Sequence, residues 1–195
     1  MRDVGAIILA AGGSSRFGQP KQLLVFQRES LVGRAVHTAS EAGCARIAVV
    51  VGNQHDLIET ELRETPAFVI HNSKWERGLG TSIRIGLQHL LGAHPKMDAV
   101  VLLTCDQPFV EARTISALMR MREDSGKPIV ASRYANTLGV PALFDCSCFE
   151  ALLALLDDSG AKALIESRVD NVAEIAFEQG AIDIDTPADF QRLTS

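Results

Sequence analysis

Short apolar runs rich in β-branched residues recur along the chain and alternate with segments of helical spacing. Each run is four to seven residues long, is apolar almost throughout and is mostly followed by polar residues or glycine. Runs of this kind are typical of strands that are covered on both faces. We therefore predict strands at residues 4–10, 46–51, 67–70, 98–103 and 128–132.

The segments between these runs repeat apolar residues every three to four positions, as amphipathic helices do. We predict helices at residues 30–43, 82–92 and 111–123, with Gly43 as the C-terminal cap of the first and Ser82 as the cap of the second. Alternation of strands and helices favours a mostly parallel, Rossmann-like sheet with right-handed crossovers. The predicted fold class is thus α/β, a three-layer α/β/α sandwich whose ligands sit at the carboxyl ends of the strands.

Length and charge place the chain among ordinary soluble domains. It has 195 residues and a formal net charge of −5, and it contains no repeat or low-complexity tract. We interpret residues 127–128 and 139–141 as local breaks and expect a single domain over residues 1–195. Because positive and negative residues are interspersed, no broad basic face is expected, and we predict no nucleic-acid partner.

Cysteine usage and hydropathy indicate where the protein resides. Cys44, Cys105, Cys146 and Cys148 have neither zinc-ligand spacing nor the density of a disulfide framework, which favours reduced thiols. The apolar run at 4–11 leads straight into a glycine-rich loop, so we interpret it as a buried first strand rather than a signal sequence. No other apolar stretch approaches the roughly 20 residues needed to cross a bilayer. We expect a cytoplasmic protein with no membrane partner.

Residues 9–21 have the chemistry of a phosphate-binding loop. Small residues allow backbone N–H groups to approach oxygen anions, while Arg16 and Lys21 supply positive charge. A P-loop would place its lysine directly after Gly18, but Lys21 comes two places late. A dinucleotide fingerprint requires a different glycine spacing, and Pro20 interrupts any early helix. Neither of these two loop types fits.

The same loop resembles the L-A-A-G-x-[GS]-x-R-[ML]-G-x-x-K pattern of nucleotidyltransferases. The matching residues are Leu9, Ala10, Ala11, Gly12, Ser14, Arg16, Gly18 and Lys21. Four later segments, at 71–83, 105–108, 158–162 and 183–187, resemble the molybdenum cofactor cytidylyltransferase (MocA-like) group of the MobA-like NTP transferase family. The resemblance covers nearly the whole chain. It implies the nucleotide-diphospho-sugar transferase type of fold and transfer of CMP from CTP to a molybdopterin-type molybdenum cofactor, with release of pyrophosphate.

The resemblance also implies roles for individual residues. Arg16, Lys21 and Asp106 are the expected catalytic residues, and Asp106 and Asp185 the expected ligands of Mg²⁺, with Mn²⁺ as an alternative ion. The expected nucleotide-binding residues are Leu9, Ala10, Ala11, Gly12, Gly13, Ser14, Ser15, Arg16, Lys21, Gly80 and Ser82. Ala11 resembles the cytidylyl branch of the group and favours CTP as the donor. The product would reach a molybdenum hydroxylase through a transient contact.

Chemistry and position support the choice of carboxylates. A hard Mg²⁺ ion takes oxygen ligands, usually one or two carboxylates beside phosphate and water. Asp106 follows an apolar strand at the edge where ligands gather. Asp185 either serves as the second ligand or caps the helix that follows Pro187. Asp183 shares the face of Asp185 if the segment is extended, and the same two roles stay open for it.

Two departures from the family pattern bear on the acceptor. Cys105 stands where glycine is usual, and Val140 stands where the close molybdenum enzymes carry a histidine that could donate a hydrogen bond to phosphate. A sugar phosphate or other small phosphorylated acceptor is therefore the first alternative, and a non-catalytic carrier of nucleotide or molybdenum cofactor is the second. We expect His71 to be structural, while Trp75 either stacks on a ligand or anchors a loop.

Overall fold

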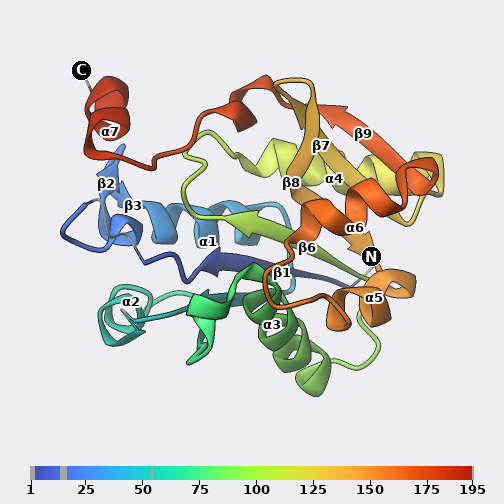
Figure 1. Cartoon of the computed structure of the whole chain (residues 1–195), viewed down its shortest axis with the longest axis horizontal. Coiled ribbons are helices and arrows are strands. Elements are labelled where there is room, and N and C mark those ends of the chain that lie inside the picture. The colour runs from blue at the N-terminus through green and yellow to red at the C-terminus, as the bar shows by residue number, and fades with distance from the viewer. Residues whose placement is uncertain (1–2, 14–16, 54, 195) are drawn as a thin grey trace.

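The computed structural model describes residues 3–13, 17–53 and 55–194 of the chain. Its centre is a seven-stranded sheet in the order β5-β4-β1-β6-β8-β7-β9 (Figure 1). The strands are β1 (Val4–Ala10), β4 (Arg46–Val51), β5 (Ala67–His71), β6 (Ala99–Thr104), β7 (Ile129–Tyr134), β8 (Thr137–Asp145) and β9 (Val172–Ala176). All five predicted strands are present, each within two residues of its predicted bounds.

Seven α-helices and a small hairpin lie around the sheet in the described part of the chain. The helices are α1 (Leu31–Glu41), α2 (His55–Glu61), α3 (Leu79–Ala93), α4 (Ala112–Ser125), α5 (Phe149–Leu153), α6 (Ala161–Ser167) and α7 (Pro187–Thr194), and the hairpin strands are β2 (Val25–Phe26) and β3 (Glu29–Ser30). Ser30 caps α1 by accepting a hydrogen bond from the Gly33 N–H. Gly43, with a φ of 87°, follows its end as predicted.

The cap predicted for the second helix is wrong. Helix α3 begins at Leu79, three residues earlier than predicted, and Gly78 is its N-terminal cap with a φ of 126°. Ser82 therefore lies inside the first turn, where its hydroxyl serves another purpose described below. A side chain at Gly78 would also meet the backbone of Asp157, so both the torsion angle and the space require glycine there.

The sheet is mostly parallel, as predicted, but β8 was missed. β5, β4, β1 and β6 run parallel, β8 is antiparallel to β6 and β7, and β9 is parallel to β7. Residues 139–141, interpreted above as a local break, lie within β8. The pairing of β7 with β8 shifts register between Ala131 and Ser132, which leaves Pro141 at an irregularity where its missing N–H interrupts no regular ladder.

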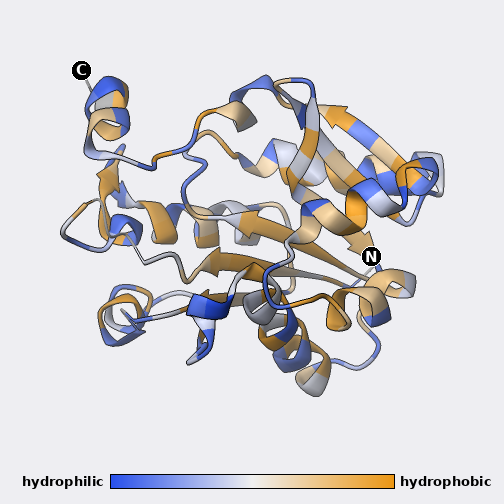
Figure 2. Ribbon diagram, viewed as in Figure 1, coloured by the Kyte–Doolittle hydropathy of each residue, from blue (hydrophilic) through white to orange (hydrophobic). Residues whose placement is uncertain are grey.

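Helices cover both faces of the sheet and make the three-layer sandwich predicted from the sequence. Because side chains alternate along a strand, Ile8 packs into a core with α1, α2 and α4, while Ile7 and Leu9 pack into a second core with α3, α5 and α6. Figure 2 shows the central strands coloured as hydrophobic between these helices. None of the described helices combines the length and apolar character needed to cross a bilayer.

A third, smaller apolar cluster joins the C-terminal segment to the hairpin. Its buried members are Leu24, Phe26, Leu31 and Ile184, and Phe190 of α7 packs against them. Ile184 is fully buried. The cluster therefore anchors residues 183–185 beside Leu24 and the hairpin, far from them in sequence.

Candidate active site

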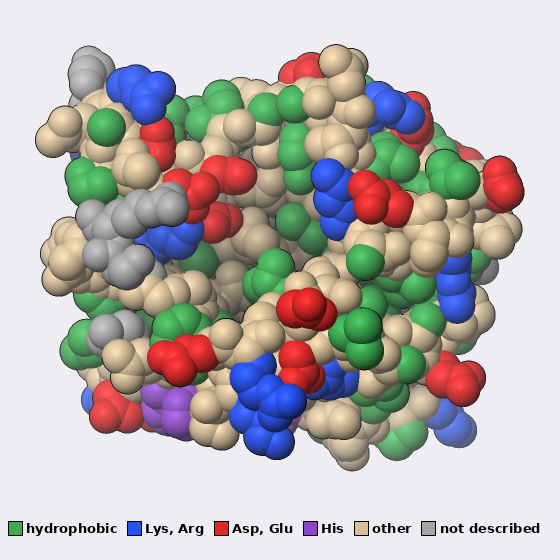
Figure 3. Space-filling view, viewed as in Figure 1, with side chains coloured by type: hydrophobic (Ala, Val, Ile, Leu, Met, Phe, Trp, Pro, Cys, Tyr) green, Lys and Arg blue, Asp and Glu red, His purple; other side chains and the backbone are tan. Residues whose placement is uncertain are grey.

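A cavity of about 340 Å³ opens at the carboxyl ends of β1 and β6. Residues 9–12, Lys21, residues 104–106 and Ser82 contribute to its lining. The chain proceeds from β1 to β4 and β5 on one side and returns to β6 on the other, so the cavity lies at the point where the strand order reverses. Figure 3 shows a hollow on this face with acidic and basic side chains gathered beside it.

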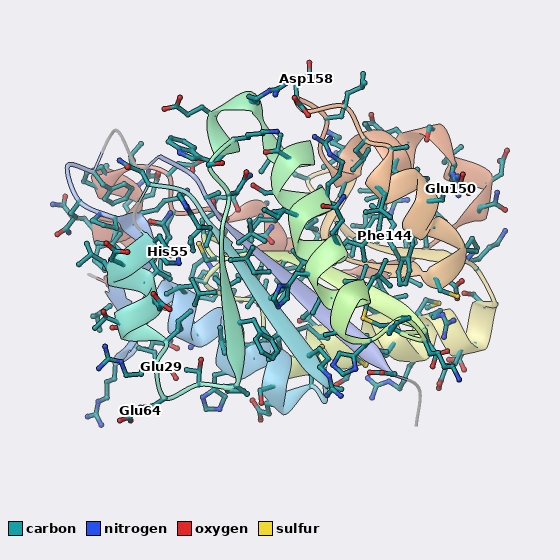
Figure 4. All side chains as sticks on the ribbon, turned by 90° about the horizontal axis from the view of Figure 1, so that it is seen from below. Glu29, His55, Glu64, Phe144, Glu150 and Asp158 are labelled. Atoms are coloured by element: carbon teal, nitrogen blue, oxygen red, sulfur yellow. The ribbon has the colours of Figure 1, made fainter. Side chains whose placement is uncertain are left out.

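A second cavity, of about 470 Å³, lies between the hairpin, α1 and the end of α2. Glu29, Glu61 and Glu64 line it, and Figure 4 shows Glu29 and Glu64 on the side away from Asp158, which marks the loop beside the start of α3. The lining of this second cavity includes no residue from the carboxyl ends of β1 and β6, where sheets of this type bind ligands. The first cavity is therefore the candidate active site.

Lys21 brings the two predicted metal ligands together. Its Nζ donates hydrogen bonds to Asp106 Oδ2 at 2.7 Å, to Asp185 Oδ1 at 3.0 Å and to the Ile184 carbonyl at 3.3 Å. Burial by itself would lower the pKa of Lys21, but the adjacent Asp106 and Asp185 outweigh it and raise that pKa above its usual value. The lysine is therefore a permanent cation at the edge of the cavity.

The direction of the Asp183 and Asp185 side chains follows from the alternation of side chains along the extended segment 183–185. The buried Ile184 donates its backbone N–H to the Asp106 carbonyl at 2.9 Å, which ties residues 183–185 to the end of β6. Asp183 and Asp185 then point away from the apolar cluster. The capping alternative for Asp185 is wrong, because the side chains of Thr186 and Asp189 cap α7 through reciprocal bonds of 2.8 and 3.2 Å to each other's backbone N–H groups.

The donor set fits a hard divalent cation. Asp106 and Asp185 already converge on a single positive charge, and their donor atoms are the carboxylate oxygens that Mg²⁺ and Mn²⁺ accept. Partial burial of the Asp183 carboxyl, together with the negative charges of Asp106 and Asp185, raises its pKa to about 6. Among the described residues of the site, the carboxyls of Asp106, Asp183 and Asp185 outnumber the one lysine, and a further cation would balance the remaining negative charge of this set.

Gln22 supports the loop and was missed in the sequence. Its buried amide donates hydrogen bonds to the Ala10 and Gly12 carbonyls at 2.7 and 2.9 Å, and so holds the segment on both sides of Ala11. The signal that could have found it is a polar residue directly after Lys21 in the 3₁₀ helix Lys21–Leu23. Ser14, Ser15 and Arg16, which the sequence assigns to nucleotide binding and catalysis, lie outside the described residues.

Trp75 has the loop-anchoring role considered for it, while its stacking on a ligand stays a prediction. Its ring lines the cavity and packs against the loop, since a Cβ placed on Gly13 or on Gly52 would lie 2.8 or 2.7 Å from the indole. These two glycines allow the ring to lie between the loop after β1 and the end of β4. Trp75 thus anchors Gly13 beside the cavity and offers an aromatic surface there.

Gly80, predicted to bind the nucleotide, packs against the loop at 154–160 and is not among the described residues that line the cavity. Its N–H donates to the Asp157 carbonyl at 3.0 Å, and a Cβ on it would lie 2.0 Å from the Leu156 carbonyl oxygen. Gly80 is thus required for close packing of α3 against the loop at 154–160. Among described residues of this helix, Leu79 and Ser82 line the cavity instead.

Cys105 and His71 lack the properties of catalytic groups. Burial and the adjacent Asp106 raise the pKa of the Cys105 thiol to about 12, so it stays protonated and poorly nucleophilic near neutral pH. His71 ends β5 at the surface, where its ring lies 5.3 Å from that of His55, centroid to centroid. His71 is not among the described residues that line the cavity, and its structural role stays a prediction.

Comparison with known proteins identifies relatives along the full chain. The purine catabolism protein PucB of Bacillus subtilis is 27% identical over 202 residues, covering 96% of this chain and 94% of that protein. The molybdenum cofactor cytidylyltransferase of Escherichia coli is 25% identical over 191 residues, covering 97% and 95%. The crystal structure of Rv0371c from Mycobacterium tuberculosis superimposes with a TM-score of 0.82 at 30% identity, over 98% of this chain and 97% of that one, and Rv0371c has also been crystallised with manganese.

The fold, the acid and lysine cluster and these likenesses agree with one another. The sandwich is that of the nucleotide-diphospho-sugar transferases, and its cavity lies at the strand-order reversal where such sheets bind ligands. Residues 6–172 match the MobA-like NTP transferase domain. The chain therefore belongs to the MobA-like NTP transferase family and is a nucleotidyltransferase.

Proposed function

We propose that the protein transfers CMP from CTP to a molybdopterin-type molybdenum cofactor and releases pyrophosphate. The observation that carries the proposal is the contact of Lys21 with both Asp106 and Asp185 at the mouth of a cavity that begins with residues 9–12. The proposal requires one nucleotide to reach all of these groups. The similarity to the E. coli cytidylyltransferase and the presence of Ala11 support CTP and the molybdenum cofactor as substrates.

The reaction places most of its demands on alignment and charge. A phosphate oxygen of the acceptor attacks the α-phosphorus of CTP, a new P–O bond forms, and the bond to the oxygen that bridges to the β-phosphate breaks. The electron pair of that bond leaves with pyrophosphate. Backbone N–H groups of residues 11–15 would hold the triphosphate, and Arg16 and Lys21 would neutralise charge on the bridging and leaving oxygens.

Asp106 and Asp185 would hold Mg²⁺ or Mn²⁺ in this scheme. When bound, the ion supplies positive charge beside the triphosphate oxygens. The contact of both carboxylates with Lys21, beside the cavity that residues 9–12 line, supports this assignment. With a triphosphate bound, phosphate oxygens would be available to Lys21 as partners besides the Asp106 and Asp185 carboxylates. A cytoplasmic enzyme is consistent with four free cysteines and with the availability of these substrates there.

The decisive experiment measures pyrophosphate release from CTP, GTP, ATP and UTP with Mg²⁺, each with and without molybdenum-loaded molybdopterin. We expect release from CTP that depends on the cofactor. Pyrophosphate release that depends on a sugar phosphate instead of molybdopterin would show that the acceptor is a sugar phosphate. The valine at position 140, in place of the histidine of the molybdenum enzymes, leaves this alternative open. Asp106→Asn should abolish nearly all turnover while retaining part of the CTP binding. Binding of CTP and cofactor with no turnover under any of these conditions would favour the carrier.

A further inference from the structure

Three hydrogen bonds meet at the buried side chain of Asn72, next to Ser82, which lines the cavity. Asn72 directly follows β5 and is 3% exposed. Its Oδ1 accepts a hydrogen bond from the backbone N–H of Lys74 at 3.0 Å. Its Nδ2 donates to Thr81 Oγ1 at 2.8 Å and to Ser82 Oγ at 2.9 Å. The amide thus connects the end of β5 to the first turn of α3.

The direction of these bonds is determined by the backbone. A backbone N–H can only donate, so the amide atom that faces Lys74 must be the oxygen, and the NH₂ group must face the two hydroxyls. An NH₂ group can also only donate. The oxygens of Thr81 and Ser82 therefore both act as acceptors toward Asn72, and the proton of each hydroxyl has to point elsewhere.

The two hydroxyl protons have different destinations. Thr81 donates its proton to the Gly78 carbonyl at 2.8 Å, one turn back along the chain. Ser82 donates no hydrogen bond to any group in the described part of the chain, although it is 1% exposed and lines the cavity. A buried hydroxyl without an acceptor is costly, so the Ser82 proton is available to a ligand that fills the cavity.

We propose that Asn72 is a positioning residue that holds Ser82 as a hydrogen-bond donor toward the nucleotide base. The inference rests on the proposed function and takes the base of CTP to lie beside Ser82, a cavity-lining residue that the sequence assigns to nucleotide binding. Cytosine presents acceptors at O2 and N3, whereas its 4-amino group is a donor and cannot take that position. Asn72 contacts Ser82 and is not among the described residues that line the cavity, so it acts on base binding indirectly.

The experiment reverses the polarity of the Ser82 hydroxyl without changing its place. In Asn72→Asp the carboxylate keeps the bond from Lys74 but can only accept, so Ser82 turns its proton toward it and its lone pairs toward the base. We expect the KM for CTP to rise about tenfold to a hundredfold while kcat changes much less. Ser82→Ala, which removes the donor, should raise the KM by a similar factor. Thr81→Val, which removes the other hydroxyl held by Asn72, should lower the melting temperature and leave the KM ratio of CTP to UTP unchanged.

The double variant Asn72→Asp/Ser82→Ala separates positioning from a general structural role. If Asn72 acts by positioning Ser82, the double variant should have a KM for CTP no higher than that of Ser82→Ala alone. If adding Asn72→Asp to Ser82→Ala raises the KM by the same factor as adding it to the wild type, the inference is overturned. Should Asn72→Asp fail to fold, calorimetric binding of Mg²⁺–CTP to Ser82→Ala decides the matter, because unchanged affinity contradicts the donor role. Failure of the wild type to turn over CTP contradicts the proposed function instead.

Discussion

The two sides of the central sheet differ in the direction of their strands and in their contribution to the cavity. β5, β4, β1 and β6 are parallel. The described residues that line the candidate active site come from the last residues of β1 and β6, from the segments that follow β1, β5 and β6, and from α3. β8, β7 and β9 contain the antiparallel pairings and supply none of those residues. Apart from Asp185, which follows β9 and contacts Lys21, the described residues of the proposed nucleotide chemistry thus come from one side of the sheet, which leaves the other side for the acceptor.

The Lys21→Met variant should have the largest effect, because it removes the cation on which Asp106 and Asp185 converge. We expect kcat to fall about 100-fold to 1,000-fold with the KM for CTP changed only a few-fold, since the charge matters most as pyrophosphate leaves. Pyrophosphate release at saturating CTP measures it. Lys96→Met, at an exposed position that precedes β6, is the matched control. A raised KM with normal kcat would show that Lys21 contributes binding alone.

Ile184→Ala should affect both stability and turnover. Ile184 is fully buried in the small cluster that anchors Asp183 and Asp185, so we expect the free energy of unfolding to fall by about 2–4 kcal/mol. We expect kcat to fall more than tenfold at a temperature where the variant remains folded. Urea denaturation and steady-state kinetics measure the two effects.

Ile129→Ala makes the same chemical change on the other side of the sheet. Ile129 is also fully buried, in β7, and should lose a similar amount of stability with kcat unchanged. Equal losses of kcat in the two variants would mean that general loosening, rather than displacement of the acids, explains the Ile184 result.

Asp145→Asn tests an ion pair at the end of β8, remote from the nucleotide. Burial by itself would raise the pKa of Asp145, but hydrogen bonds from Arg122 and Ser147 outweigh it and lower that pKa below its usual value. The ionised Asp145 carboxylate therefore stabilises the fold at pH values above its pKa in the unfolded chain. This stabilisation is lost as the pH falls through the lower pKa of Asp145 in the folded protein.

We expect Asp145→Asn to lower the free energy of unfolding by about 1–2 kcal/mol at pH 7, with the difference from wild type shrinking below about pH 4. Urea midpoints at several pH values measure this, with kcat unchanged. Glu174→Gln removes an exposed pair with Arg133 and should have little effect at any pH. A difference that stays constant as the pH falls would assign the loss to altered packing.

The same division explains what could be predicted from the sequence. Strands covered on both faces need apolar runs, and the glycine-rich loop and Asp106 follow such runs directly. The strands and loops on the side of the sheet that contains β1 and β6 could therefore be predicted from the sequence. β8 was missed because Gly139 and Pro141 interrupt its pattern, and the bulge that accommodates them is a tertiary feature. The roles of Gln22 and Asn72 were hidden for a related reason. Their partners lie 9–12 residues away and meet them only after strand and helix have packed.

Val140→His should have the smallest effect and tests whether the side containing β8 receives the acceptor. Val140 is half-buried in β8, and the resemblance to molybdenum enzymes places a phosphate-binding histidine there. If the acceptor phosphate lies within reach, the added donor should lower the KM for molybdopterin about twofold to tenfold and leave the KM for CTP unchanged. Val140→Leu, which changes size without adding a donor, should not reproduce the gain. A change in the KM for CTP, or the same gain with leucine, would mean that the two sides of the sheet do not divide donor from acceptor.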